Sequence, residues 1–355
     1  MEKAFQAVYS GILYGSVYGL IAIGLTLIWG SLRMLNLAHG SLYLVGAYIA
    51  YLFVTWQTGF LQSPVMPYVW TVLVAAGAIS VILAIVRHER VPNIVRWVAA
   101  FLVLKTSIDI ATALINWAPD RLPLILSFLL AVIGAGITGF LIQFLMVDRI
   151  LGKPGWDTAS LIVTVGASIM LQSATLLIFG PQRKYLPPLI EGHFKIGSVL
   201  IINHQLSVIV LAVISLVLLS MFLQRTRYGL AIQAVSQHMD AARLMGIPVR
   251  TVFWLVMAIS AALAGLAGVL LSSVYDLSPT SGYDPMTRAL VVTIFGGLGS
   301  VKGTIWAAFI IGLLESAMQV YLGAGLAIPG LFLFMMIMLV ILPNGLFGVG
   351  EGQRL

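Results

Sequence analysis

The chain has 355 residues, of which 60% are hydrophobic and only 9% are charged. Soluble domains carry about 25% charged residues, so this composition excludes a soluble globular protein and predicts an integral membrane protein. The formal net charge is +7. Because the cations lie mainly between apolar segments, we attribute this charge to lipid head groups and membrane orientation and expect no nucleic-acid partner. The absence of cysteine excludes disulfides, thiolate metal sites and cysteine nucleophiles.

The apolar segments predict an all-α, polytopic fold with about ten or eleven membrane-spanning helices in a single domain, residues 1–355. We expect no cleavable signal peptide, because residues 4–32 form a charge-free run that is long enough to span the membrane. The ninth apolar segment is too short for a full helix, which leaves the count open. The predicted spans lie near Val8–Trp29, Ser41–Trp56, Pro67–Val86, Trp97–Trp117, Leu122–Val147, Ala159–Phe179, Val199–Leu223, Thr251–Tyr275, Ala289–Leu298, Gly303–Tyr321 and Leu326–Leu342.

The distribution of Lys and Arg predicts the orientation of the chain. With eleven spans and an external N-terminus, twelve cations lie in inner segments, six lie outside and one lies within a span. Inner segments of membrane proteins carry the excess of Lys and Arg, so we expect residues 224–250 and the C-terminal tail in the cytoplasm. The loop Gly180–Ile196 fits least well, since it places three cations outside. The six outer cations are Lys3, Arg121, Arg183, Lys184, Lys195 and Arg288.

The first predicted span carries Gly11, Gly15 and Gly19, which are spaced four residues apart. Small residues on one helical face let another backbone approach closely, which is how membrane helices pack against one another. Two interpretations remain open at this stage. The stripe either packs within the chain or forms a subunit interface or pore wall.

Two segments interrupt apolar sequence with polar residues or glycine, at residues 31–48 and 295–304. Irregular backbone at membrane depth survives only when it is buried in protein or lines a wet cavity. Both segments are therefore candidates for a translocation path, and we expect residues 35–40 and 296–303 to approach each other near a central passage. For the first segment, a plain cytoplasmic turn is the alternative. The candidate residues are Asn36, His39, Gly40, Gly296, Gly297 and Gly299.

The second interrupted segment is not a phosphate-binding loop, because Val301 stands where a glycine should precede Lys302. The order of a cation, a glycine and a hydroxyl occurs at His39–Gly40–Ser41 and again at Lys302–Gly303–Thr304. This order is consistent with an internal repeat, a common plan in transporters.

Ionisable residues are rare inside the predicted spans, and a carboxylate at membrane depth is a functional candidate by default. Glu315 has no local partner in the sequence and joins the path candidates as a proton carrier, a substrate contact or a packing residue. Lys105 and Asp109 lie four residues apart in the fourth span, where they can neutralise each other on one helical face.

The segment Gln224–Arg250 differs in composition from the apolar spans around it. Its apolar residues recur at helical spacing, which predicts one short amphipathic helix that presents an apolar face to a cytoplasmic partner and ends at Gly246 and Pro248. The alternative is a solvated loop that its arginines anchor to anionic lipid. The apolar positions are Ala231, Ile232, Val235, Met239 and Ala242.

Several stretches closely resemble the permease subunits of branched-chain amino acid ABC importers, over roughly residues 5–56 and 125–349. They are GLIAIGLTLIWGSLRMLNLAHGSLYLVGAY, TRYGLAIQAVSQHMDAARLMGIPV, ISAALAGLAGVLL, FGGLGSVKGTIWAAFIIGLLES and ILPNGLFG. The resemblance implies an all-helical, non-enzymatic subunit of the cell (inner) membrane without a cofactor. It also implies a second related permease, two cytoplasmic ATP-binding subunits and an external binding protein as partners.

By the same resemblance, Arg225–Ile247 is the coupling segment that docks on an ATP-binding subunit. The residues carried over to this role are Arg225, Arg227, Gly229, Asp240, Ala241, Ala242, Arg243 and Gly246. Branched-chain amino acids are the expected substrates. Close relatives within the group carry urea or short amides, so these compounds are the alternative.

The sequence departs from the family pattern between Gln57 and Pro123, where the family usually has a short link and a single span. We predict an insertion of two additional spans in residues 57–123. An even number of added spans preserves the orientation of everything that follows.

Other classes of function fit the sequence less well. A secondary transporter would need its own coupling-ion site, and no chain of carboxylates suggests a proton relay. A channel would need a repeated selectivity element, and an intramembrane enzyme would need paired catalytic groups such as HExxH or GxSxG, which the sequence lacks.

Overall fold

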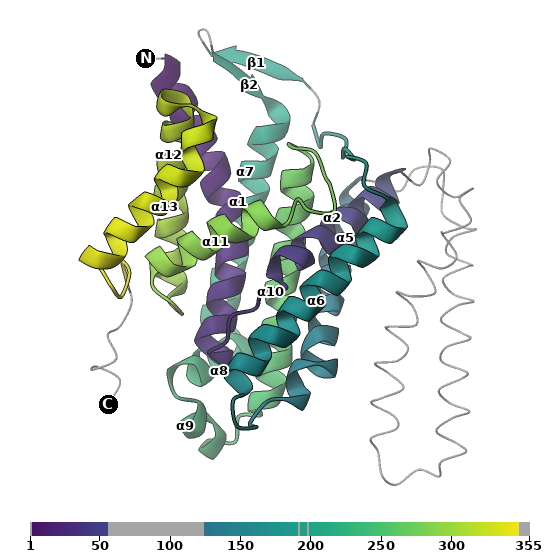
Figure 1. The fold of residues 1–355 in the computed structure, drawn as a ribbon, viewed down its shortest axis with the longest axis vertical. Helices are drawn as coiled ribbons and strands as arrows, with labels where there is room; N and C mark the ends of the chain where they lie inside the picture. Colours follow the sequence, from purple (N-terminus) through teal and green to yellow (C-terminus); the bar gives the residue numbers. More distant parts are fainter. Residues whose placement is uncertain (1, 56–123, 191, 197–198, 348–355) are drawn as a thin grey trace.

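The computed structural model describes residues 2–55, 124–190, 192–196 and 199–347, and helices dominate these parts of the chain (Figure 1). Seven of the described helices are long and apolar enough to cross a membrane. The chain is therefore a mostly helical, multi-pass membrane protein, as the composition predicts. The seven helices are α1 (Glu2–Leu32), α5 (Leu124–Leu145), α6 (Trp156–Phe179), α7 (Asn203–Arg225), α10 (Val249–Ser272), α12 (Val301–Leu322) and α13 (Ala324–Ile341).

Shorter helices complete the described fold. Two of them, α2 (His39–Thr55) and α11 (Tyr283–Gly296), correspond to the second and ninth predicted spans. Three others lie between spans, namely η3 (Val147–Arg149), α8 (Arg227–Gln237) and α9 (Met239–Leu244). The third and fourth predicted spans, the Lys105–Asp109 pair and the predicted insertion at 57–123 lie outside the described residues.

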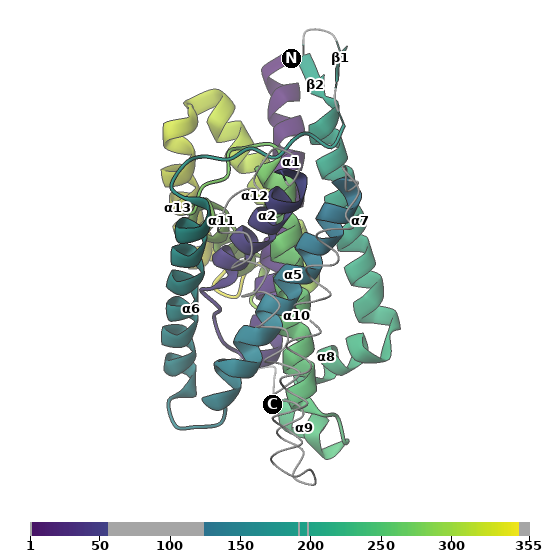
Figure 2. The same ribbon diagram turned by 90° about the vertical axis from the view of Figure 1, so that its right-hand side faces the viewer.

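A short hairpin at residues 193–202 departs from the otherwise helical fold. Here β1 (His193–Ile196) and β2 (Val199–Ile202) form an antiparallel hairpin with His193 opposite Ile202. The predicted seventh span begins too early for the same reason, since α7 starts only at Asn203. A short apolar run such as VLII does not distinguish a strand from a helix by periodicity alone. The hairpin lies at the same end of the molecule as the N-terminus (Figure 2).

The core of the fold is built around α1 and α10. Helix α1 packs against α12, α10, α11 and α7, while α10 also packs against α5 and α2. Leu20, Ile21 and Ile23 in the middle of α1 are fully buried. Helices α6, α7 and α13 instead expose many large apolar side chains, for which a membrane protein has lipid or a further subunit as neighbours.

The glycine stripe of α1 packs within the chain, which confirms the first of its two interpretations. A Cβ atom at Gly11 would lie 2.7 Å from the Cα of Leu313, and one at Gly15 would lie 2.9 Å from the Cα of Phe309. Gly312 completes the contact from the α12 side, where a Cβ would overlap the backbone nitrogen of Gly15. Glycine is therefore required on both helices for this close approach.

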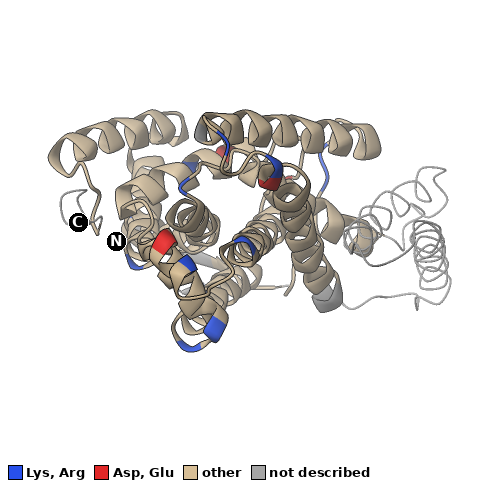
Figure 3. Cartoon of the chain, turned by 90° about the horizontal axis from the view of Figure 1, so that it is seen from below, with Lys and Arg blue, Asp and Glu red and all other residues tan. Residues whose placement is uncertain are grey.

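Helices α8 and α9 lie at the end opposite to the N-terminus and the hairpin (Figure 1). Arg225, Arg227 and Arg243 lie in or directly beside these two helices, and Lys and Arg are blue in the view from this end (Figure 3). The side of the membrane on which each end lies stays a prediction. One cation is misplaced in the prediction, because Arg288 does not belong to an outer loop but lies within α11.

Candidate translocation path and coupling segment

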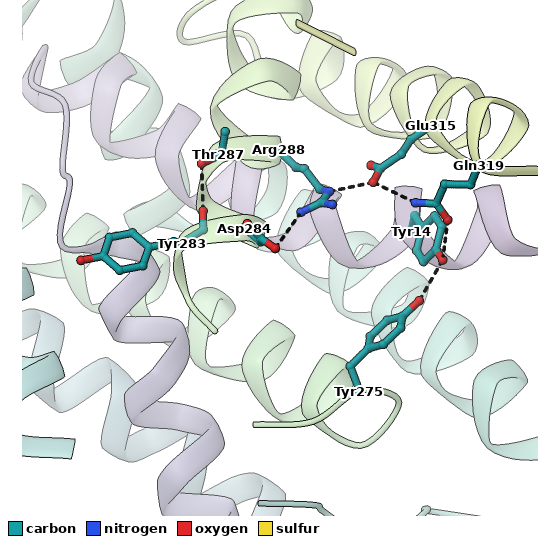
Figure 4. A network of polar contacts seen from close by, with 8 residues as sticks. All are labelled: Tyr14, Tyr275, Tyr283, Asp284, Thr287, Arg288, Glu315 and Gln319. Atoms are coloured by element: carbon teal, nitrogen blue, oxygen red, sulfur yellow. Dashed lines mark hydrogen bonds and ion pairs between the residues drawn. The ribbon is translucent and has the colours of Figure 1, made fainter. Parts of the chain in front are cut away.

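A polar network links α11 to α12 through Glu315, whose side chain is fully buried (Figure 4). Arg288 of α11 donates from Nε to Oε1 of Glu315 at 2.7 Å, and Gln319 donates to the same oxygen at 3.2 Å. The Arg288 side chain is 17% exposed, and its guanidinium lies 5.8 Å from the centre of the Tyr18 ring. The membrane-spanning part of the chain therefore holds a charge-compensated pair.

The sequence shows no charged partner close to Glu315 along the chain, and its counter-ion comes from another helix. Gln319, one turn further along α12, is a local hydrogen-bond partner. A signal for Arg288 was present, since it stands in the run MTRALVVTIFG, in which apolar residues follow it for more than one turn. A cation in such a run belongs inside a helix and needs a counter-ion.

Two tyrosines extend the network away from Glu315. Tyr275, which follows α10, donates its hydroxyl to that of Tyr14 at 2.8 Å. Tyr14 in turn donates to Oε1 of Gln319 at 3.2 Å. The network therefore joins α1, α11, α12 and the segment after α10 (Figure 4), whereas Oε2 of Glu315 has no hydrogen-bond partner among the described residues.

The first predicted path segment, between α1 and α2, is buried in the packed interior. Asn36 accepts the backbone N–H of Ala38 at 3.0 Å, which closes the turn before α2. Nε2 of His39 lies 3.1 Å from the carbonyl oxygen of Ile21 in α1. A Cβ at Gly40 would lie 2.6 Å from the carbonyl oxygen of Gly282, so this glycine permits close contact with the residue that precedes α11.

The second predicted path segment connects α11 to α12. Gly297 and Gly299 have φ values of 97° and 87°, a conformation that favours glycine. Ser300 then caps α12 by accepting the N–H of Gly303 at 3.2 Å. A Cβ at Gly296 would lie 2.7 Å from the Cα of Thr304, so the two helices meet closely at this turn.

Both interrupted segments pack against α1, but at different positions. The first reaches Ile21 through His39, whereas Thr304 after the second shares a 2.7 Å hydrogen bond with Thr26. Gly40 lies against Gly282, whereas Gly299 lies against Gly30. Their approach to each other at a shared central passage stays a prediction.

A cavity of about 510 Å³ opens at the end that carries α8 and α9. Its walls come from α1, α7, α8 and the start of α12, with Thr26, Gln224, Gln233 and Lys302 among the polar residues. Of the path candidates, Gly299 lines this cavity. The remaining six are not part of its lining.

Residues 224–250 form two short helices instead of the single predicted one. The hydroxyl of Thr226 accepts the N–H of Gly229 at 3.0 Å and starts α8. Helix α8 ends at Gln237. His238 follows, and its Nδ1 accepts the N–H of Ala241 at 3.2 Å, which starts α9. Two successive N-caps therefore divide the segment, and the second uses a histidine that the helical pattern treated as interior.

The predicted outward apolar face of this segment is wrong. Ile232, Val235 and Ala242 are buried, and α8 packs against α1, α7 and α10 of the same chain. The exposed large apolar residues of the segment are instead Tyr228, Leu230, Leu244 and Met245, and the last two have the highest exposed fractions, 89% and 83%. Periodicity identifies an apolar face but not the surface on which it packs. Of the coupling candidates, Gly229 and Ala242 are buried, while Arg225, Arg227, Asp240, Ala241, Arg243 and Gly246 are exposed.

Comparison with known proteins identifies the family. Residues 7–91 and 97–341 match the family described as "Branched-chain amino acid transport system / permease component". The chain belongs to this family. No solved structure matches it.

Its relatives align over nearly the whole permease. The chain is 26% identical over 358 residues to the high-affinity branched-chain amino acid transport system permease protein LivH of Salmonella typhimurium (strain LT2), covering 98% of this chain and 97% of that protein. The permease protein BraD of Pseudomonas aeruginosa gives the same identity and coverage. A probable LivH of Methanocaldococcus jannaschii is 27% identical over 346 residues, covering 95% and 90%. The chain is thus the non-catalytic, multi-pass permease component of an ABC transport system, a class that works with ATPase and binding-protein partners.

One further cluster in this permease was missed by sequence reasoning. Asp148, whose side chain is 3% exposed, accepts hydrogen bonds from Arg250 Nε at 2.9 Å and from Trp254 Nε1 at 2.8 Å. Gln143 donates to the other carboxylate oxygen at 3.2 Å. The cluster connects Gln143 of α5 and Asp148 of η3 to the first turns of α10, where residues 224–250 end.

Proposed function

We propose that this permease carries branched-chain amino acids inward across the cell (inner) membrane, driven by ATP hydrolysis in separate subunits. The full-length family match supports the substrate class and the machine. The structural observation that carries the coupling part is the α8–α9 pair. It packs its own apolar face on the permease and leaves Leu244 and Met245 exposed at the cationic end.

We place the ATP-binding subunit against α9. Two adjacent, nearly fully exposed apolar side chains, beside the exposed residues Asp240 and Arg243, suit a groove on a soluble partner. Motion of α9 would pass into α10 through Gly246 and Pro248, and the Arg250–Asp148 pair would pass it on to α5. The segment can transmit this motion to the membrane helices because it is short and α8 packs against α1, α7 and α10.

The partners of the proposed machine are a second related permease, two cytoplasmic ATP-binding subunits and an external binding protein. In this proposal the glycine-interrupted helix ends near Gly40 and Gly297, which pack against neighbouring helices, would offer backbone partial charges to a zwitterion once the path opens. The cavity lined by Gly299 would serve as the inner exit, because it opens beside α8.

The coupling role is tested by Ala241→Glu and Leu244→Asp, with Ala241→Ser and Leu244→Met as matched controls at the same positions. Both positions are exposed, so the permease should still insert and fold. We expect ATP-dependent leucine uptake into proteoliposomes to fall by about tenfold or more in the charged variants, as for a hot-spot contact. The ATP-binding subunits should also dissociate more readily. Normal uptake in both charged variants would exclude α9 as the docking element.

The same assay separates the alternatives. Urea or short amides as substrates would compete with leucine uptake or replace it. A secondary transporter would accumulate leucine from an ion gradient without ATP. The ion pair of Glu315 with Arg288 supports the ATP-driven class, because the guanidinium compensates the charge of Glu315, which is therefore not an obvious proton carrier.

A further inference from the structure

A second cavity, of about 240 Å³, lies between α11 and α13 and is charged on one side and apolar on the other. Drug-sized ligands occupy pockets of about 300–1,000 Å³, so this one is of the size for a small metabolite. The polar lining residues are Asp284, Thr287 and Arg288, and the apolar ones are Val291, Ile328, Leu331 and Phe332.

The charged side presents both signs of charge at close range. Nη1 of Arg288 lies 3.9 Å from Oδ2 of Asp284, while Nε of Arg288 is held by Glu315 (Figure 4). A guanidinium carries five N–H donors in a rigid fork, so binding Glu315 through Nε leaves the fork able to bind a second carboxylate. The Asp284 side chain is 77% exposed, which leaves its carboxylate accessible to an ammonium group.

This arrangement favours a zwitterion over an ion of one sign. Glu315, Arg288 and Asp284 together sum to a charge of −1, which repels a simple anion from the guanidinium. An α-amino acid adds no net charge. It carries a carboxylate and an ammonium group on one carbon atom, so the two groups can each face one member of the Arg288–Asp284 pair, whose charged atoms lie 3.9 Å apart.

The opposite side of the cavity suits an apolar side chain. Val291 and Leu331 are buried and form its inner wall, whereas Ile328 and Phe332 are partly exposed and border its opening. Aliphatic side chains packed between these residues would gain about 25 cal/mol for each Å² removed from water.

We propose that this cavity is a substrate station for L-α-amino acids with branched apolar side chains. Arg288 binds the carboxylate, Asp284 binds the ammonium group, and Val291, Ile328 and Leu331 contact the side chain. The proposal rests on the proposed function, since it assigns a binding site to the same cargo. It also gives Glu315 a role as a positioning residue, because its carboxylate holds Arg288 at the cavity.

The test uses the complete transporter in proteoliposomes and exploits the absence of cysteine from this chain. Ile328→Cys places a single thiol at the cavity opening, and Thr280→Cys places a control thiol on the exposed loop before α11. L-Leucine at ten times its dissociation constant should slow alkylation of Ile328→Cys by about tenfold, by simple occupancy. Leucinamide and 4-methyl-2-oxopentanoate, which lack the carboxylate charge and the ammonium group, should protect little. Thr280→Cys should react at the same rate throughout.

A second variant tests the charged side. Asp284→Asn in the Ile328→Cys background should raise the half-protecting leucine concentration by about tenfold, the equivalent of one lost charge contact. Asp276→Asn is the matched control, because Asp276 pairs with Arg183 on the surface at 3.0 Å and does not line the cavity. The parent transporter is assayed for leucine uptake alongside.

The outcomes separate this inference from the proposed function. Absence of leucine uptake by the parent transporter would overturn the proposed function. Normal uptake with no protection of Ile328→Cys, with equal protection by all three compounds, or with no difference between Asp284→Asn and Asp276→Asn would overturn the substrate station alone.

Discussion

Replacing Asp148 should destabilise the junction between the coupling segment and the membrane helices. Its carboxylate is almost fully buried and accepts three hydrogen bonds, from Arg250, Trp254 and Gln143. Asp148→Ala removes both acceptor oxygens and leaves the donors of Trp254 and Gln143 without this partner. Asp148→Asn keeps the shape and one acceptor oxygen, so its effect should be smaller.

The magnitude follows from the exposure of each partner. The Arg250 side chain is 54% exposed, so its ion pair contributes at most about 1 kcal/mol. The bond from Trp254 to a charged acceptor contributes about 1.5–3 kcal/mol, and leaving the buried Gln143 unsatisfied costs about 1 kcal/mol more. Asp148→Ala should therefore cost about 3–5 kcal/mol, and Asp148→Asn about half of that.

Thermal unfolding of the purified permease measures this loss. An unfolding entropy of about 2.1 cal/mol/K per residue over 355 residues gives about 0.75 kcal/mol/K, so Asp148→Ala should lower Tm by about 4–7 °C. The fluorescence of Trp254, which packs edge-on against Phe144 at 5.7 Å, reports locally on the junction.

Asp240→Ala is the control, because Asp240 and its partner Arg243 are both exposed and their pair at 3.4 Å should contribute almost nothing. If Asp148→Ala melts within about 1 °C of Asp240→Ala, the junction does not stabilise the fold and the reasoning is refuted.

Three further predictions follow from other parts of the structure. Gln237→Cys should react only with permeant thiol reagents and Gln182→Cys also with impermeant ones in intact cells, since cations concentrate at the end with α8; the reverse pattern would invert the topology. Gly312→Leu should sharply reduce the amount of folded permease in the membrane, because a Cβ there overlaps α1, whereas Gly166→Leu, which has open space around it, should accumulate normally; equal levels would contradict the close packing. The double variant Glu315→Gln/Arg288→Met should lower Tm by less than the sum of the two single variants, because each single change leaves one buried charge unpaired; we expect a coupling energy of about 2 kcal/mol. Additive shifts would mean that the buried pair carries no coupling.

Much of this protein could be predicted from its sequence, because the membrane imposes local rules on the chain. Low charge and long apolar runs predicted a multi-pass helical protein, and the described helices lie close to nine of the predicted spans. The glycine spacing in α1 predicted a close helix contact, and the order of several motifs indicated the family. These signals depend on residues a few positions apart, where helical geometry relates sequence directly to structure.

Only the tertiary structure decided which residues meet. Arg288 and Glu315 belong to different helices, and Asp148 lies far along the chain from Arg250 and Trp254, so no local pattern pairs them. The apolar stripe of α8 was visible in the sequence, but packing turned it toward α1 and α10 and left Leu244 and Met245 outside. Hydropathy and periodicity measure how apolar a face is. Which surface covers that face, and which charge compensates another, depends on how distant helices pack, because burial and ion pairing are properties of the assembled fold.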